Sequence, residues 1–302
     1  MKLNQALIKI PAWAKVMQWM PPGVVRGLIG CQARLARLSL GRARRRKLMD
    51  FFEQVRLRSG VRETAEELLL EHLRAEAMGR AVLARVVGSH SSGDDALLRV
   101  DGMEHVASCL VQGKGCVLGG LHLGAAALPA AYLIRHGISV VTLRRRELKE
   151  HFDPDEVEPR FYGAEPRWIS PDENPAALMK GCLKDLSEGK VVSYLVDGSM
   201  GERGVVVEIF NASTFMRTGA LELARIAKVP FIPAFGYVGK DGVSIKYHEP
   251  IDLSDAGDMA TGMKAIASFY EDFVRTHPAN CTRRHADQFI FEGRKADIHG
   301  PR

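Results

Sequence analysis

The chain has 302 residues, of which 46% are hydrophobic and 26% are charged. This composition is typical of a folded globular protein that is long enough to bury a sizeable core. The five cysteines are odd in number and include no Cys-x-x-Cys pair. Their pattern indicates a reducing compartment and argues against both a disulfide framework and a zinc site.

The net charge of +6 is concentrated at the N-terminus. Residues 1–60 hold 13 Lys or Arg and only two acids, Asp50 and Glu53, whereas the rest of the chain is mildly acidic. A basic segment on an acidic body predicts an anionic partner, of which a phospholipid surface, a nucleic acid and an acidic carrier protein are candidates. No nucleic-acid motif or aromatic stacking pattern accompanies the basic residues, so we expect no nucleic acid.

Residues 1–88 are predicted to form a helical N-terminal region. Apolar residues alternate with basic ones from Leu7 to Leu38, and residues 61–87 have the spacing of a long helix. No uncharged apolar run approaches the roughly 18–20 residues that span a bilayer, and no cleaved signal peptide is expected. The tryptophans favour a helix that lies in the membrane interface, although an amphipathic helix packed on its own domain explains the pattern equally well.

A dense basic cluster occupies the middle of this region. Its members are Arg42, Arg44, Arg45, Arg46 and Lys47. We expect the cluster to contact an anionic membrane surface, although a solvated helix face is the simpler explanation. A polar stretch at 89–95 then separates the N-terminal region from a second domain that covers residues 95–302.

Strands and helices alternate through the second domain. Helices are predicted at 102–112, 124–136, 175–188, 216–228 and 258–276, and strands at 116–121, 138–144, 191–196, 204–210, 230–236 and 243–248. Such alternation predicts an α/β fold with a mostly parallel, mixed sheet covered by helices.

The best candidate for a catalytic group is His122. It follows an apolar strand and precedes a predicted helix, where its ring would be exposed and close to the positive end of that helix. A histidine so placed can remove a proton from a substrate hydroxyl. Arg144 to Arg146 and Asp197 also follow strand ends, where ligands of open α/β sheets gather. We therefore expect these groups to line one site, although a structural histidine, a solvated loop and a turn would explain each of them singly.

Five blocks of the chain, in the same order, resemble blocks of the late acyltransferases of lipid A biosynthesis. The blocks are Gly113 to Gly124 with its His122-Leu123-Gly124 ending, Glu158 to Ile169, Asp197 to Phe210, Thr214 to Phe235, and His277-Pro278 with His285. The resemblance covers most of the chain and implies a fold of the glycerolipid-acyltransferase kind, with the basic segment as a membrane-associated start.

The resemblance implies the transfer of a fatty acyl group from an acyl-carrier-protein or coenzyme A thioester to a hydroxyl, or an amine, of a lipid acceptor. His122 would be the general base and Asp197 its catalytic support. The residues implied in substrate binding are Arg144, Arg160, Gly163, Gly198, Thr214 and Gly219. No metal or redox cofactor is implied. The protein would sit peripherally on the cytoplasmic face of the bacterial inner membrane.

The chain departs from the family pattern at one position that bears on catalysis. The family motif is H-x-x-x-x-D/E, and here the residue five positions after His122 is Ala127. An acid at this point orients the imidazole and stabilises its charged form. If Asp197 or Glu202 takes over that role, we expect an active enzyme; if none does, we expect an inactive homologue that binds lipid or acyl chains. A carboxylate within about 2.6–3.2 Å of the imidazole would favour the enzyme.

Overall fold

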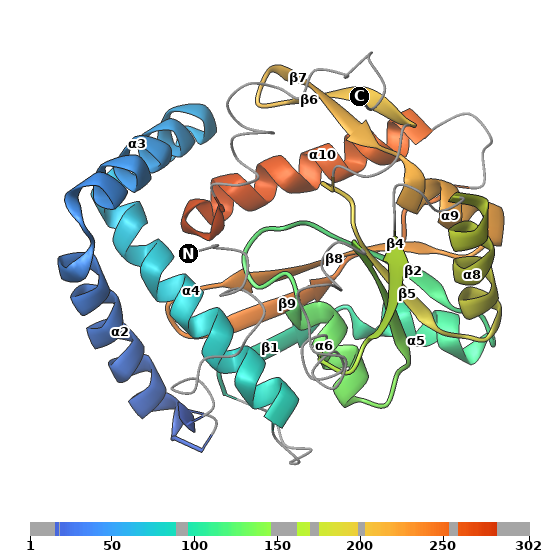
Figure 1. The fold of residues 1–302 in the computed structure, drawn as a ribbon, viewed down its shortest axis with the longest axis horizontal. Helices are drawn as coiled ribbons and strands as arrows, with labels where there is room; N and C mark the ends of the chain where they lie inside the picture. Colours follow the sequence, from blue (N-terminus) through green and yellow to red (C-terminus); the bar gives the residue numbers. More distant parts are fainter. Residues whose placement is uncertain are drawn as a thin grey trace.

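The computed structural model describes residues 16–17, 19–88, 96–145, 162–169, 175–198, 203–253 and 259–282. The helices are α2 (Pro22–Ser39), α3 (Arg42–Ser59), α4 (Ala65–Gly88), α5 (Met103–Val111), α6 (Leu128–Arg135), α8 (Pro175–Ser187), α9 (Gly219–Ala227) and α10 (Met259–Thr276), followed by the 3₁₀ turn η3 (Pro278–Asn280). Helices α2, α3 and α4 flank a central sheet, and α10 crosses it (Figure 1).

The central sheet has seven strands in the order β1-β9-β8-β2-β5-β3-β4. Their bounds are β1 (Leu98–Asp101), β2 (Cys116–Gly120), β3 (Val140–Arg145), β4 (Glu165–Ile169), β5 (Val191–Leu195), β8 (Phe231–Val238) and β9 (Val243–Tyr247). All neighbours pair in parallel except β8 and β9, which are antiparallel. The strands β6 (Gly204–Ile209) and β7 (Ala212–Arg217) form a separate hairpin. The prediction of a mostly parallel, mixed sheet is thus confirmed.

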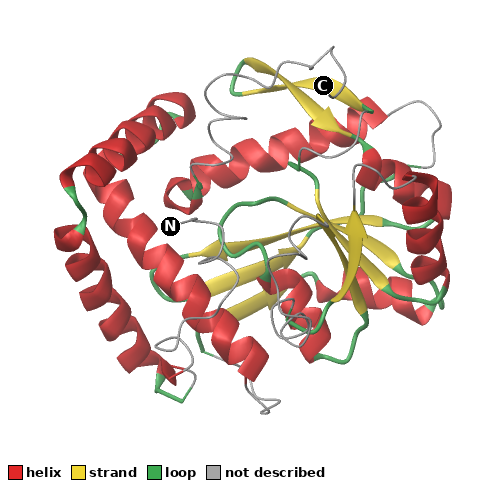
Figure 2. Cartoon of the chain, in the orientation of Figure 1, coloured by secondary structure: helices red, strands yellow, loops and turns green. Residues whose placement is uncertain are grey.

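Helices cover both faces of the sheet, as the ribbon coloured by secondary structure shows (Figure 2). Successive strand residues point to opposite faces, so Val117 and Val192 join the core under α8, α9 and α10, whereas Cys116 and Val191 join the core over α5 and α6. Because both faces are buried, the central strands read as continuous apolar runs rather than as alternating ones.

The N-terminal helices share these two cores. Phe51, Phe52 and Val55 of α3 are buried with the α10 side of the sheet, and Val25 and Ile29 of α2 are buried with the α6 side. Helix α4 contributes to both cores. Among the described residues, no helix is long and apolar enough to cross a membrane.

The sheet has its switch point between β2 and β5. The chain leaves β2 towards α6 on one face, and it leaves β5 through the hairpin towards α9 on the other face. Connections that diverge from two neighbouring parallel strands open a crevice at the carboxyl ends of those strands. This point of the fold is therefore the expected place for a ligand.

Three strands were not predicted from the sequence. β1 is a short edge strand without alternating burial, and β4 is an edge strand that contains Pro166, a residue that argues against a central strand. β7 was missed because the sequence does not mark the turn before it, in which Phe210 and Asn211 both have positive φ. Two-residue turns of this kind usually contain Asn-Gly or Asp-Gly. As a result, the helix predicted over 216–228 begins only at Gly219.

Candidate active site

The imidazole of His122 and the carboxylate of Asp197 meet at the switch point. β2 and β5 pair with Gly120 opposite Leu195, and each of the two site residues follows two positions later. The Nδ1 of His122 lies 2.7 Å from Oδ1 of Asp197, and the backbone N–H of His122 donates to Oδ2 over 2.8 Å. One carboxylate thus holds both the main chain and the ring of the histidine.

The two side chains differ in exposure. The Asp197 side chain is completely buried, whereas 38% of the His122 side chain is exposed. A buried carboxylate accepts a hydrogen bond from Nδ1–H, so the neutral ring carries its lone pair on Nε2. The ring is therefore held in the tautomer that a general base requires, with part of its surface open to solvent.

The surroundings of His122 differ from expectation in one respect. The helix after β2 does not begin at residue 124 but at Leu128, so His122 lies in a loop and not at the positive end of a helix. The reason is Gly124, whose φ of +54° breaks the helical path. The N–H of Ala125 then donates to the carbonyl of Gly236 on β8, which turns the loop across the sheet edge.

Ala127, where the family motif has its acid, packs on the hydrophobic core that contains α6. It is the last residue before that helix. The carboxylate that lies within hydrogen-bonding reach of the imidazole comes instead from the end of β5. Of the two outcomes considered from the sequence, the geometry meets the criterion set for the enzyme.

The family model of the bacterial lipid A biosynthesis acyltransferases matches residues 11–282. The chain belongs to this family. The resemblance drawn from the order of the sequence blocks is therefore confirmed.

Curated relatives include two mycobacterial proteins named phosphatidylinositol mannoside acyltransferase. The protein of Mycobacterium tuberculosis is 24% identical over 188 residues, which are 60% of this chain and 57% of the relative. The protein of Mycolicibacterium smegmatis is 24% identical over 184 residues, which are 61% of this chain and 60% of the relative. The chain thus matches less than two thirds of the length of these relatives.

Arg144 is the last but one residue of β3 and is partly buried, with its Nε shielded from solvent. Burial lowers the pKa of its guanidinium, and burial also raises the pKa of the nearby Tyr162, whose interaction with Arg144 opposes that rise. Gly163 follows Tyr162 with a φ of +86°, and a side chain there would meet Ile134. The implied roles of Arg144 and Gly163 in substrate binding stay predictions. Arg160, Arg146, Glu202 and His285 lie outside the described residues.

The three other residues implied in substrate binding lie around β5 and α9. Gly198 directly follows Asp197, and its N–H donates to the carbonyl of Leu195. Gly219 begins α9, and a Cβ added to it would lie 3.5 Å from the hydroxyl oxygen of Tyr194. Thr214 is fully buried, and its hydroxyl donates to the carbonyl of Ala212 within the hairpin. That inward orientation gives no support to a substrate contact by Thr214, which stays a prediction.

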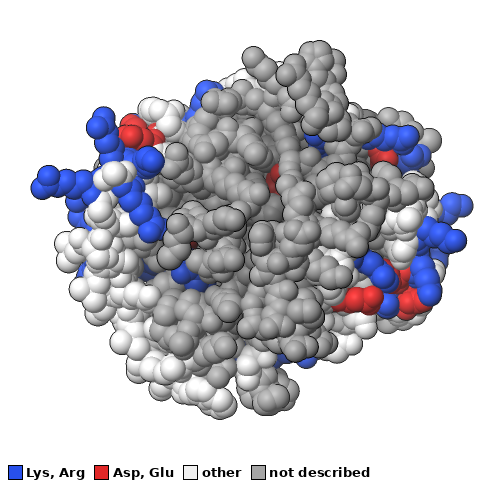
Figure 3. Space-filling model, in the orientation of Figure 1, with Lys and Arg blue, Asp and Glu red and all other residues white. Residues whose placement is uncertain are grey.

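The basic cluster lies on the first turns of α3, and all of its members are exposed. Figure 3 shows Lys and Arg side chains gathered over this helix. Arg45 pairs with Glu66 of α4 over 2.9 Å, and Arg37 of α2 pairs with the same carboxylate. Arg45 of the cluster thus links α3 to α4 through an exposed ion pair, and the contact of the cluster with a membrane stays a prediction.

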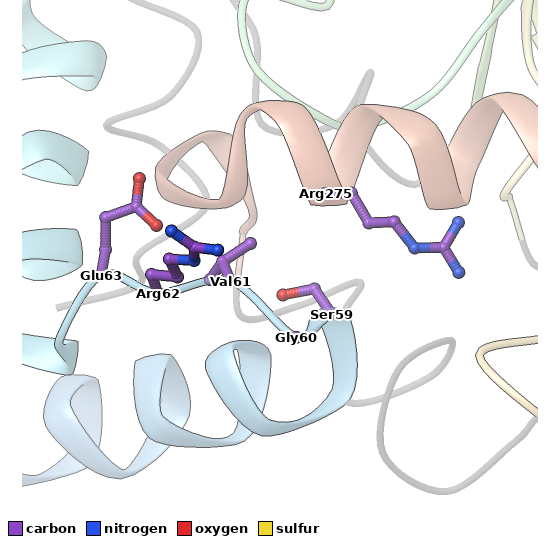
Figure 4. Close-up of a pocket in the computed structure, with 6 residues that line it drawn as sticks. All are labelled: Ser59, Gly60, Val61, Arg62, Glu63 and Arg275. Carbon is purple, nitrogen blue, oxygen red and sulfur yellow. The ribbon is translucent and has the colours of Figure 1, made fainter.

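Two hollows have linings that do not include His122. One of about 630 Å³ is lined by the end of α3, the turn after it and Arg275 of α10 (Figure 4). The other, of about 360 Å³, lies between α4 and the end of α10. No group of three or more His, Cys, Asp or Glu side chains in the described part of the chain could hold a metal ion.

Two residues that the sequence did not single out contact the loop that carries His122. They are Asn280 and Thr282, which follow α10. The sequence offered little to find them, since both are common polar residues more than 150 positions away from the histidine. Only their closeness to the His277-Pro278 block pointed to that segment.

Proposed function

We propose that the protein transfers a fatty acyl group from a thioester donor to a hydroxyl of a lipid acceptor, with His122 as the general base and Asp197 as the group that orients it. The observation that carries this proposal is the 2.7 Å contact between the two side chains at the switch point of the sheet. Family membership supports acyl transfer, and the names of the mycobacterial relatives support a glycolipid acceptor.

In the proposed reaction, Nε2 of His122 takes the proton of the acceptor hydroxyl while its oxygen attacks the thioester carbonyl. The new carbon–oxygen bond forms, the carbon–sulfur bond breaks, and the leaving thiolate receives the proton from the imidazolium. The carboxylate of Asp197 stabilises that transient positive charge, which a buried acid does better than a solvated one. An acyl carrier protein and coenzyme A are both suitable donors, and an amine can replace the hydroxyl as nucleophile.

The alternative is a non-catalytic protein that binds lipid or acyl chains. The missing acid at Ala127 is the observation that favours it. The pairing of His122 with Asp197 weighs against it, because a binding pocket has no need of an oriented imidazole.

The test incubates the purified chain with acyl-carrier-protein or acyl-coenzyme A thioesters and a membrane lipid extract. We expect the wild type to release free thiol and an acylated lipid, and His122→Ala to lose both. His136→Ala is the matched control, because that histidine is exposed and its Nδ1 contacts the backbone carbonyl of Tyr132, one turn earlier in α6. Equal thioester loss in the wild type and His122→Ala would contradict the proposal.

We also propose that the N-terminal helices contact an anionic membrane, which would bring the lipid acceptor to the site. Large apolar side chains of this region are exposed, including Trp19 at 78%, Leu35 at 66% and Leu38 at 80%. Exposed apolar residues beside a basic cluster are typical of interfacial binding. An acidic carrier protein would use the charges but would not need the apolar residues.

Flotation with vesicles that contain phosphatidylglycerol tests this contact. The triple variant Trp19→Ser, Leu35→Ser, Leu38→Ser should float less than the wild type, whereas Val111→Ser, at an exposed position of α5, should float like the wild type. Point variants are preferable to removal of residues 1–60, because α3 supplies buried core residues. Equal flotation of all variants would contradict the proposal.

A further inference from the structure

The loop that carries His122 is fastened to the segment after α10. The hydroxyl of Thr282 donates to the carbonyl of His122 over 3.2 Å. Two residues further along the loop, the N–H of Gly124 donates to the carbonyl of Asn280 over 3.0 Å. Together with the backbone bond from His122 to Asp197, these contacts hold the main chain of the histidine from two sides.

The side chain of Asn280 makes this fastening rigid. It is buried, with 5% of its surface exposed. Its Oδ1 accepts from the N–H of Val238 over 2.8 Å, and its Nδ2 donates to the carbonyl of the same residue over 2.9 Å. A side-chain amide presents the same donor and acceptor as a peptide group. Asn280 therefore continues the pairing of β8 beyond the point where β2 turns away towards His122.

Two glycines leave the space that this arrangement needs. A Cβ on Gly124 would lie 2.3 Å from the carbonyl oxygen of Gly236 and 2.8 Å from Oδ1 of Asn280. A Cβ on Gly236 would lie 2.6 Å from the carbonyl oxygen of Ala125. The loop, the end of β8 and Asn280 are thus packed backbone to backbone, so a shift of one displaces the others.

The same segment is held from its other side by α4. The Nδ1 of His72 lies 2.9 Å from the carbonyl oxygen of Ala279, the neighbour of Asn280. His72 itself packs against Phe52 of α3. The 3₁₀ turn η3 is therefore fixed between the N-terminal helices and the loop.

We propose that Asn280 and Thr282 are positioning residues for His122. They fix the backbone of the histidine, and its fixed backbone places Nδ1 within reach of Asp197. The consequence for turnover rests on the proposed acyl transfer, whereas the consequence for the loop does not. Loss of the Thr282 hydroxyl should loosen the loop without altering the protein fold, since the residue is only half-buried.

The test compares Thr282→Val, which keeps the shape and removes the hydroxyl, with Thr282→Ser, which keeps the hydroxyl. Thr276→Val is the matched control, because the hydroxyl of Thr276 bonds to Asp272 within α10. Asn280→Ala is a stronger second variant. Amide hydrogen exchange of the peptide over 119–127 reports the order of the loop independently of activity, and the thermal midpoint reports the fold.

We expect Thr282→Val to speed exchange in the 119–127 peptide about fivefold and to lower kcat by a similar factor, with KM unchanged, as the loss of one hydrogen bond worth about 1 kcal/mol predicts. Thr282→Ser should restore both values, and Thr276→Val should change neither. Unaltered exchange in both Thr282→Val and Asn280→Ala would overturn the proposal. If the wild type transfers no acyl group, the proposed function fails, and the exchange measurement still decides the role of the two residues.

Discussion

The carboxylate of Asp197 binds His122 twice, once at the backbone N–H and once at Nδ1 of the ring. The acid comes from the strand next to the one that presents the histidine, 75 residues later in the chain. The orientation of the imidazole thus depends on sheet pairing and not on the local sequence after the histidine.

Replacement of Asp197 by asparagine should abolish most of the activity. The amide cannot stabilise an imidazolium and favours the wrong tautomer, so we expect kcat to fall by about a thousandfold or more, in line with the serine-protease template. Steady-state transfer assays measure the effect. Asp272→Asn, at an exposed position, serves as the control. Retention of more than a tenth of the wild-type kcat would contradict the orienting role of Asp197.

Restoration of the family acid should bring no gain. In Ala127→Glu, the new charge would lie against a hydrophobic core, and the Nδ1 of His122 already has Asp197 as its partner. We expect kcat at or below the wild-type value and a free energy of unfolding lower by about 1–2 kcal/mol. A tenfold rise in kcat would mean that Asp197 does not perform the work of the missing acid.

Substitution of Gly124 by alanine should be costly for stability. The residue has a φ of +54°, and its Cβ would overlap two oxygen atoms. We expect a loss of at least about 2 kcal/mol. Gly137→Ala is a matched control with a φ of +77° and open space around its Cβ, so only about 1 kcal/mol of backbone strain applies there. Chemical denaturation distinguishes the two variants, and equal losses would contradict the close approach at Gly124.

A salt-bridge group at the other end of β5 should matter only for stability. Asp185 is buried and accepts two hydrogen bonds from Arg167 and one from Lys190. Burial alone would raise the pKa of Asp185, but the bonds from Arg167 and Lys190 outweigh it and lower that pKa. Asp185→Asn should therefore cost about 2–3 kcal/mol at pH 7, because Arg167 loses its buried partner.

The sign of this effect fixes its pH dependence. Since the folded-state pKa of Asp185 is lowered, its contribution is complete above the unfolded pKa of about 3.9 and is lost as the pH falls through the folded value. The difference between the variant and the wild type should thus shrink below pH 4. Glu165→Gln, at an exposed partner of Lys190, should change stability by less than about 1 kcal/mol. A pH-independent difference would contradict this assignment.

A second pH effect should come from His248. Burial, and then the positive charge of Lys246 and His105, lower the pKa of His248 to about 4. The unfolded chain binds more protons than the folded one between about pH 4 and 6.5, so the free energy of unfolding should fall as the pH drops through this window, by up to about 3 kcal/mol.

The variant His248→Gln measures that contribution. Urea denaturation at pH 7, 5.5 and 4.5 should give a shallower decline for the variant than for the wild type. Some decline remains because burial also lowers the pKa of His277. Identical slopes for the variant and the wild type would exclude His248 as the source.

Sequence reasoning found the fold class, both members of the histidine–aspartate pair and the family. These features depend on apolar runs and on residues at strand ends, which a linear pattern records. Sequence reasoning missed β4 because a proline on an edge strand leaves no apolar pattern. It misplaced the start of α6 because the φ of Gly124 depends on contacts with Gly236 and Asn280. Sequence reasoning left Glu202 open beside Asp197 as the acid that orients His122, since the register of β2 and β5 cannot be read from spacing.

The dependence of the His122 loop on Asn280 and Thr282 has a consequence for synthesis. The loop emerges from the ribosome long before the residues that fasten it, and the strand that supplies Asp197 also follows later. During translation the histidine thus has neither its acid nor its fixed backbone. The geometry of the proposed general base is therefore complete only after Thr282 has been synthesised.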